Sequence, residues 1–372
     1  MNVSDLQTSK LVLSVDAMGG DQGPAPIVAG LKSFLTKHKD VHVLLHGQEN
    51  ELKPLIEKRK LDDRVTIVHA DDVVAMTDKP SQVMRHGKST SMWSAVESVR
   101  NKDAAVCISC GNTGALMAIS MVRLRKAEGV NRPAIACLWP SRTKAGFSVM
   151  LDAGADIRAD EEDLLTYALM GASYARNGLE VDKPRVGLLN VGVEEHKGRA
   201  ELKVAHDIIR RAAPKGDFEY VGFVEGGDLP SERVDVIVTD GFTGNVALKT
   251  GEGTANFISD SLRAAFLATP FSRIAALLAA TSLGRLKKKI DPRRVNGGVF
   301  LGLNGTVIKS HGSADATGVE AALTLAERLG RSGFSDKLAA RVASAAMLAQ
   351  NDANDEQVKQ AEDGAPKDEN PK

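Results

Sequence analysis

Short apolar runs alternate along this chain with longer stretches whose apolar residues recur at helical spacing. The runs are rich in β-branched residues, which is typical of strands, and small or polar residues end them. We expect strands at 11–15, 41–45, 104–108, 147–151, 185–189 and 234–238, and helices at 24–37, 52–60, 113–126, 161–176 and 199–212. Such alternation predicts an α/β protein, a three-layer αβα sandwich around a mostly parallel sheet.

Five of the predicted strands are followed by polar loops that contain glycine. These loops begin at Asp16, Ser109, Asp152, Asn190 and Asp240. In an open parallel sheet the carboxyl ends of the strands line one edge, where ligands bind, so we expect a single extended cleft. The alternative is that the glycines only make tight turns between strand and helix.

Two of these loops run directly into predicted helices. They are Gly111-Asn112-Thr113-Gly114 and the segment 240–245, which contains Asp240, Thr243, Gly244 and Asn245. Backbone N–H groups at the start of a helix face an anion favourably, so the two loops predict sites for a phosphate and for an oxyanion. Ordinary helix capping explains the same residues equally well.

A third loop, 194–198, carries alternating charges between two glycines. Lys197 would neutralise a phosphate or a developing negative charge, and His196 would exchange protons near neutral pH. A solvated charge cluster is the ordinary alternative. His311 follows the apolar run 306–308 and is a further candidate donor, although a lone histidine is more often structural.

The composition narrows the class of protein. Among 372 residues, Lys and Arg number 48 and Asp and Glu number 48, which argues against a general nucleic-acid binder. Three cysteines fit a reducing compartment. No stretch of about 18 apolar residues occurs, and the N-terminus lacks a signal-like segment, so we expect a cytoplasmic protein.

Two motifs are set aside. Gly87-Lys88-Ser89-Thr90 resembles the end of a phosphate-binding P-loop, but Gln82 stands where that pattern requires glycine. Cys107 and Cys110 form a CxxC motif, yet Cys107 lies in an apolar strand-like run, where a free cysteine usually packs as a small apolar residue. A single CxxC does not complete a zinc site.

The segment 255–294 is apolar and then basic. Pro270 should begin a second helix in it. Six cations and one acid in 285–294 give a local charge of +5. This predicted arm fits a dimer interface, a reversible contact with an anionic membrane, or a docking surface for an acidic carrier protein. The proposed contact residues are Phe271, Ile274, Leu277, Leu278, Lys287, Lys288 and Lys289.

We expect one catalytic domain over residues 10–350, which includes this arm. The segment 351–372 is polar and charged, and we expect it to be disordered.

The loops, read together, resemble the bacterial phosphate acyltransferases of the PlsX family. The resemblance runs in order over roughly residues 11–330. Its segments are Val15-Asp16-Ala17-Met18-Gly19-Gly20-Asp21, Asp78-Lys79-Pro80-Ser81, Gly111-Asn112-Thr113-Gly114-Ala115, Leu188-Leu189-Asn190-Val191-Gly192, Glu194-Glu195-His196-Lys197-Gly198, Gly222-Phe223-Val224-Glu225-Gly226, Thr239-Asp240-Gly241-Phe242-Thr243-Gly244-Asn245, Leu301-Gly302-Leu303-Asn304-Gly305 and His311-Gly312-Ser313.

The resemblance implies a homodimer with a fold like that of isocitrate and isopropylmalate dehydrogenases. It implies transfer of a fatty acyl group from acyl carrier protein to inorganic phosphate, without cofactor or metal. The acyl phosphate would then pass to a membrane glycerol-3-phosphate acyltransferase in phospholipid synthesis, and the protein would associate peripherally with the membrane.

By the same resemblance, Lys197 and Asn245 are the leading catalytic candidates, with His196 beside them. The predicted substrate- or phosphate-binding residues are Asp16, Gly19, Gly20, Gly111, Asn112, Thr113, Gly114, Asn190, Asp240, Thr243, Gly244 and His311. Three alternatives stay open: a phosphate acetyltransferase-like enzyme that uses acyl-CoA, a metal-dependent decarboxylating dehydrogenase, and a non-catalytic membrane scaffold.

Overall fold

The computed structural model describes residues 11–290, 297–335 and 337–340, without the side chains of 287–290. The expected disordered tail, 351–372, lies outside the described residues. The strands are β1 Leu11–Asp16, β2 Val41–Gly47, β3 Val65–His69, β4 Val106–Ser109, β5 Ala134–Pro140, β6 Phe147–Leu151, β7 Arg185–Leu189, β8 Glu219–Val224, β9 Val236–Val238, β10 Gly298–Leu301 and β11 Thr306–Lys309.

Helices separate most of these strands. They are α1 Pro24–Lys37, α2 Glu49–Arg59, α3 Pro80–His86, α4 Ser91–Arg100, α5 Thr113–Arg123, α6 Glu161–Leu179, α7 Ala200–Gly216, α8 Gly241–Leu267, α9 Pro270–Leu278, α10 Ala280–Ile290 and α11 Ala316–Arg331. All of the predicted strands and helices are present, several of them with shifted ends. The sequence pattern alone did not identify α3, α4 and α11, nor β3, β5, β8, β10 and β11, as separate elements.

All the strands belong to one sheet in the order β3-β2-β1-β4-β11-β10-β5-β6-β9-β7-β8. Most neighbours are parallel, but β10 is antiparallel to β11 and β5, and β5 is antiparallel to β6. The strands β6, β9, β7 and β8 therefore run opposite to β1, β4 and β11. The mostly parallel α/β class is confirmed.

The expectation that all five polar loops line one edge of a parallel sheet is wrong. The loops after β1 and β4 belong to one half of the sheet, and those after β6, β7 and β9 belong to the half of opposite direction. The physical reason is the antiparallel pairing of β5 with β6, because the two antiparallel contacts of β10 cancel and leave β5 parallel to β11.

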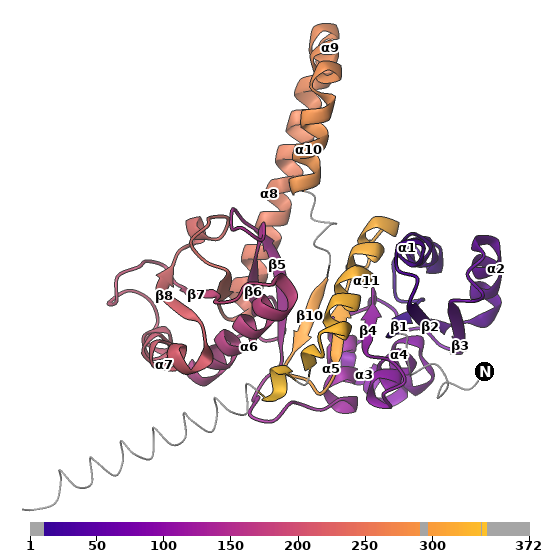
Figure 1. The fold of residues 1–372 in the computed structure, drawn as a ribbon, viewed down its shortest axis with the longest axis horizontal. Coiled ribbons are helices and arrows are strands. Elements are labelled where there is room, and N and C mark those ends of the chain that lie inside the picture. Colours follow the sequence, from indigo (N-terminus) through magenta and orange to yellow (C-terminus); the bar gives the residue numbers. More distant parts are fainter. Residues whose placement is uncertain (1–10, 291–296, 336, 341–372) are drawn as a thin grey trace, which may run out of the picture.

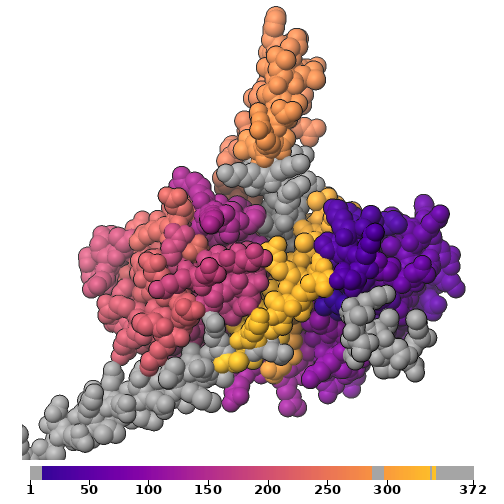
Figure 2. All heavy atoms as spheres, in the orientation of Figure 1, coloured from indigo at the N-terminus to yellow at the C-terminus, as the bar shows by residue number. Residues whose placement is uncertain are grey.

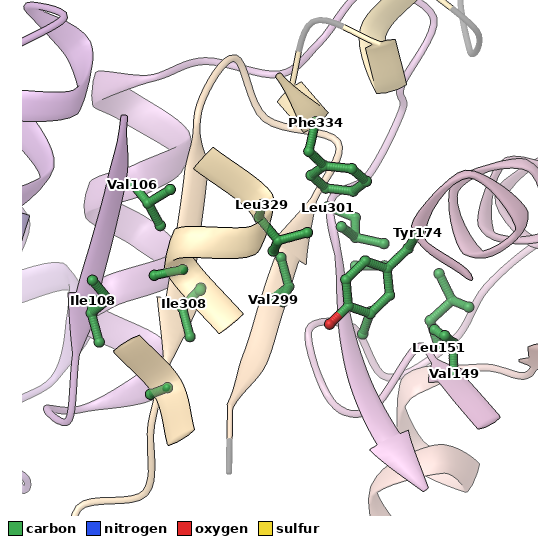
Figure 3. Close-up of a cluster of buried hydrophobic side chains, with 14 of the residues drawn as sticks. Val106, Ile108, Val149, Leu151, Tyr174, Val299, Leu301, Ile308, Leu329 and Phe334 are labelled. Carbon is green, nitrogen blue, oxygen red and sulfur yellow. The ribbon is translucent and has the colours of Figure 1, made fainter. Parts of the chain in front are cut away.

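Helices cover both faces of this sheet (Figure 1). Apolar residues of α1, α2, α6, α7 and α11 share one buried cluster, and those of α3, α4 and α5 share another that Leu248 of α8 joins. The first cluster continues across the reversal between the two halves. Figure 3 shows Val106 and Ile308 on one side of it, Val299 and Leu301 in the middle, and Tyr174 beyond them.

Local chemistry explains where the arm elements begin. Asp240 caps α8 by accepting a hydrogen bond from the backbone N–H of Thr243 at 2.8 Å. Thr269 caps α9 in the same way through Ser272, and Pro270 takes the first helical position, as predicted. The arm projects from the body as α8 with α9 and α10 (Figures 1 and 2).

Side chains at the tip of this arm are exposed. Phe271 is 84%, Leu277 77% and Leu278 84% exposed. Over the described residues, no helix has the length and apolarity needed to cross a membrane. The predicted contact residues Lys287, Lys288 and Lys289 have side chains outside the described part of the chain.

Burial of His46 should make the free energy of unfolding decrease as the pH falls. Its ring nitrogens contact the hydroxyl oxygens of Ser14 at 3.0 Å and Ser94 at 2.9 Å, and burial lowers its pKa to about 3. Below pH 6.5 this histidine is therefore protonated in the unfolded chain but stays neutral in the folded chain.

Between pH 7 and pH 5, the free energy of unfolding of wild type should fall by about 2 kcal/mol relative to that of His46→Gln. Urea unfolding at both pH values measures it. A difference that does not change with pH would contradict the expectation.

Candidate functional site

Asp16, at the end of β1, anchors the first group of polar loops. Its buried carboxylate accepts hydrogen bonds from the hydroxyls of Ser91 at 2.7 Å and Ser109 at 2.6 Å, and from the N–H of Met18 at 3.2 Å. Burial raises its pKa, while the bonds from Ser109 and Ser91 oppose the rise. The backbone N–H of Gly111 donates to the Ser109 oxygen at 3.0 Å, so Asp16 positions the loop after β4.

Close backbone packing joins the loops after β1, β4 and β11. A side-chain carbon at Gly19 would lie 2.7 Å from the Cα of Gly111, so the first two loops approach this closely only because residue 19 is glycine. The N–H of Asp21 donates to the carbonyl of Gly312 at 2.8 Å, and Gly20 lies against the same carbonyl. The structure therefore brings Asp16, Gly19, Gly20, Gly111 and the loop of His311 together.

Helix α5 starts in this group, and its cap uses Asn112. The Asn112 carbonyl oxygen accepts from the N–H of Ala115 at 3.1 Å, and its amide donates to the carbonyls of Met76 at 3.0 Å and Asp78 at 2.9 Å. The capping interpretation thus describes this side chain. Thr113 and Gly114, the first two helical residues, are exposed.

The second group lies after β7, around Asn190. The buried amide of Asn190 donates to the carbonyls of Gly192 at 3.1 Å and Lys197 at 3.2 Å, which folds the loop on itself. Gly198 adopts a φ of 89° and packs on the same side chain. His196 is exposed.

The Lys197 ammonium forms an ion pair with Glu194 at 2.9 Å, and this bond raises the lysine pKa. Lys197 is therefore a fully charged, accessible cation near neutral pH.

Carboxylates of the protein itself surround the start of α8. Asp240 is buried, caps the helix and pairs with Arg199. Asp156 accepts from the N–H of Gly241 at 3.1 Å and from the hydroxyl of Tyr167 at 2.5 Å. The backbone N–H groups of Gly241 and Thr243, at the predicted anion site, thus already donate to carboxylates of the protein. Helix capping accounts for the role of Asp240.

Asp152, at the end of β6, supports the same helix start. Burial raises its pKa to about 6, although backbone N–H groups, among them those of Asp156 and Ile135 at 2.8 Å, oppose the rise. Gly244 packs directly on its backbone carbonyl. One residue further on, Asn245 is exposed and lies beside Gly154, and Thr243 is exposed as well.

Helix α8 connects the two groups. It begins at the second group, and Glu252, three turns along, approaches His311 of the first group at 3.5 Å between Oε1 and Nε2. Burial lowers the His311 pKa, and the Glu252 carboxylate opposes this. The predicted site residues thus form two clusters along one helix.

A surface hollow and two cysteines are further candidate features. A surface hollow of about 690 Å³ is lined by Arg132, Asp156, Ile157, Arg158, Asp160, Glu161 and Glu201, none of which the loop analysis selected. Cys107 and Cys110 are free and buried, as expected. Among the described residues, no group of three or more His, Cys, Asp or Glu is arranged to hold a metal ion.

Lys309, the last residue of β11, was missed by the sequence analysis. It is half-buried beside Cys110, and burial lowers its pKa. A lysine that ends an apolar strand directly before the Ser310-His311-Gly312 loop was the available signal, since strand ends carry ligand residues in such sheets.

Comparison with known proteins identifies the family. The family model described as "Fatty acid synthesis protein" matches residues 11–337. A curated phosphate acyltransferase of Dinoroseobacter shibae is 71% identical over 90% of this chain and 87% of its own length. One of Paracoccus denitrificans is 66% identical over 91% of this chain and 92% of its own.

Among solved structures, a phosphotransacetylase of Streptococcus pyogenes matches with a TM-score of 0.57 and 16% identity, covering 88% of this chain and 99% of that one. The EutD phosphotransacetylase of Staphylococcus aureus matches with a TM-score of 0.55 and 14% identity, covering 88% and 100%. These likenesses concern the fold alone. The sequence matches show that the chain belongs to the PlsX family of phosphate acyltransferases.

Proposed function

We propose that the protein transfers a fatty acyl group from acyl carrier protein to inorganic phosphate, as a committed step toward phosphatidic acid. The observation that carries the reaction class is the identity of 66–71% to phosphate acyltransferases over most of the chain. A phosphate oxygen forms the new C–O bond to the thioester carbonyl carbon, the C–S bond breaks, and the departing carrier thiolate takes up a proton.

The polar groups suit this chemistry because phosphate is already a nucleophile and the thioester is already activated. The protein has to supply proximity, charge neutralisation and polarisation of the carbonyl. In our proposal Lys197 balances the phosphate charge, Asn245 donates to the developing oxyanion, and His196 exchanges protons nearby.

The remaining predicted residues position these groups. Asp16, Gly19, Gly20, Gly111 and Asn112 shape the first cluster, where Thr113 and Gly114 present backbone N–H groups to phosphate. Asn190 and Asp240 hold the loop and the helix that carry Lys197 and Asn245. Thr243, Gly244 and His311 complete the proposed surface.

The decisive experiment offers two acyl donors side by side. Purified protein receives inorganic phosphate with either long-chain acyl carrier protein or the matching acyl-CoA, and acyl phosphate is trapped by hydroxylamine. We expect kcat/KM for the carrier-protein thioester to exceed that for the acyl-CoA at least tenfold. Preference for acyl-CoA would replace the proposed donor with the phosphate acetyltransferase-like alternative.

We further propose that the protein is a homodimer that touches anionic membranes reversibly through its arm. Apolar side chains of α8, among them Phe242, Val246 and Phe257, are exposed in the single chain, and α9 exposes more at the tip. Exposed apolar surface of this kind fits an interface between protomers near the body and a lipid contact at the tip. Such a position would suit delivery of acyl phosphate to a membrane glycerol-3-phosphate acyltransferase.

The lipid contact can be tested at Leu277 and Leu278. Changing both to Glu should reduce co-sedimentation with vesicles containing anionic phospholipid at least tenfold, because two charges replace two exposed apolar contacts. Acyl phosphate formation in solution should be unchanged. Thr281→Glu, at an exposed polar position on α10, serves as the charge control, and unchanged sedimentation of the double variant would refute the contact.

A further inference from the structure

Strand register aligns Asp16, Ser109 and Lys309 in one row across β1, β4 and β11. Asp16 is the register partner of Ser109, and Ser109 is the partner of Lys309. Adjacent parallel strands lie about 4.8 Å apart. Lys309 therefore stands one strand from the Ser109 hydroxyl that bonds both Asp16 and the Gly111 loop.

The side chains of this row share one face of the sheet. Ser91 of α4 donates to Asp16, so Asp16 points toward α4. On β11, Val307 packs in the cluster with α4 and α5, while Ile308 packs in the opposite cluster. By strand alternation Lys309 points to the face of Val307, where α4, α5 and the first half of α8 lie.

Charges of both signs lie around Lys309, but in the described part of the chain none forms a direct ion pair with it. Its ammonium donates to the carbonyl of Ser310, and among the residues that the structure describes no carboxylate forms an ion pair with it. Burial lowers its pKa and nearby Lys249 of α8 adds to this, whereas Cys110 and the carboxylates of Asp21 and Asp16 oppose it. Lys249 itself pairs with Glu252 at 2.8 Å.

Two lysines thus approach the same space from β11 and α8, beside His311. Holding a half-buried cation without a direct ion pair is unfavourable, and a bound anion would offset that cost. Lysine is a common phosphate ligand, acting as a point charge. Helix α5 begins four residues after Ser109, and its first residues, Thr113 and Gly114, are exposed, so their N–H groups are accessible to an anion.

We propose that Lys309 is a phosphate-binding residue of the acyl transfer, whose ammonium holds the phosphate substrate at the carboxyl end of β11. This rests on the proposed function, because it names a further group that holds the nucleophile. Lys309 then acts from the first cluster of loops, while Lys197 acts from the second.

Replacing Lys309 with Met removes the charge and keeps most of the length. Loss of one charged hydrogen bond of about 1.5–3 kcal/mol corresponds to a rise of roughly 10- to 100-fold in the phosphate KM. The KM for the acyl donor should change less than threefold. Lys309→Arg should recover part of the phosphate affinity, because it restores the charge.

Lys126→Met is the matched control. The Lys126 ammonium also donates to a backbone carbonyl, that of Asn131 at 2.8 Å, but it lies outside both clusters. Its phosphate KM should equal that of wild type. If Lys309 only balanced buried carboxylates, Lys309→Met would lower the melting temperature and change both KM values alike, and the proposal would be overturned.

A second measurement needs no variant. Wild-type protein is labelled with acetic anhydride in phosphate or in chloride of equal ionic strength, and acetylation of Lys309 is read by mass spectrometry. Phosphate should slow labelling of Lys309 at least fivefold and leave Lys126 unaffected. Equal labelling in both salts, from protein that still forms acyl phosphate, would reject the role of Lys309 while the proposed function stands.

Discussion

Changing Asn245 to Ala is expected to lower kcat for acyl phosphate formation by about 10²- to 10³-fold, the usual loss when one oxyanion donor is removed. The side chain is exposed in the second turn of α8 and lies beside Gly154. Alanine is the better helix former by about 0.5 kcal/mol, so the melting temperature should stay or rise slightly. Activity and stability should therefore move in opposite directions.

Thr250→Ala is the matched control for Asn245. It is an exposed position on the same helix, outside the proposed site, and should keep its kcat within about twofold. Kinetics by hydroxylamine trapping and thermal unfolding of both variants provide the measurement. A kcat near that of wild type for Asn245→Ala would remove Asn245 from the mechanism.

Changing Gly244 to Ala should destabilise the fold by about 3 kcal/mol, although alanine favours helices. The added methyl group would overlap the backbone carbonyl oxygen of Asp152, which cannot swing away as a flexible side chain would. The start of α8 would then separate from the end of β6, and activity should fall as well. Chemical denaturation measures the loss.

Gly253 offers the opposite expectation on the same helix. A methyl group there meets no atom within 4 Å, so Gly253→Ala should stabilise by about 0.5–1 kcal/mol through helix propensity alone. Two glycine-to-alanine changes nine residues apart should thus have opposite signs. Similar stability for the two variants would show that Gly244 is not tightly packed.

Strand pattern and loop composition were enough to predict the α/β class, the start of α9 at Pro270 and the grouping of Asp16 with the Gly111 loop. They were not enough to predict the reversal of strand direction. That reversal depends on the antiparallel pairing of β5 with β6, and the β5 sequence Ala134–Pro140 mixes small, aliphatic, aromatic and sulfur side chains. Hydrogen-bond partners between distant strands leave no periodic mark in the sequence.

Side-chain roles were harder to predict than loop positions. Asn112 and Asp240 follow a pattern shared by ligand sites and by helix caps, and only the hydrogen bonds to Ala115 and Thr243 assign them as caps. Lys309 was overlooked because the preceding apolar run made it look like the polar end of a strand. Its placement beside Ser109 depends on register, which sequence alone does not give.

Helix α8 runs without a break from the second group of loops to the tip of the arm, so its length sets the distance between them. At 1.5 Å per residue, the 22 steps from Asn245 to Leu267 span about 33 Å, close to the thickness of a bilayer's hydrocarbon core. In the proposed arrangement, a membrane at the far end of this helix would lie about one hydrocarbon-core thickness from Asn245. Acyl phosphate formed beside Asn245 would then have to travel that distance to reach the membrane.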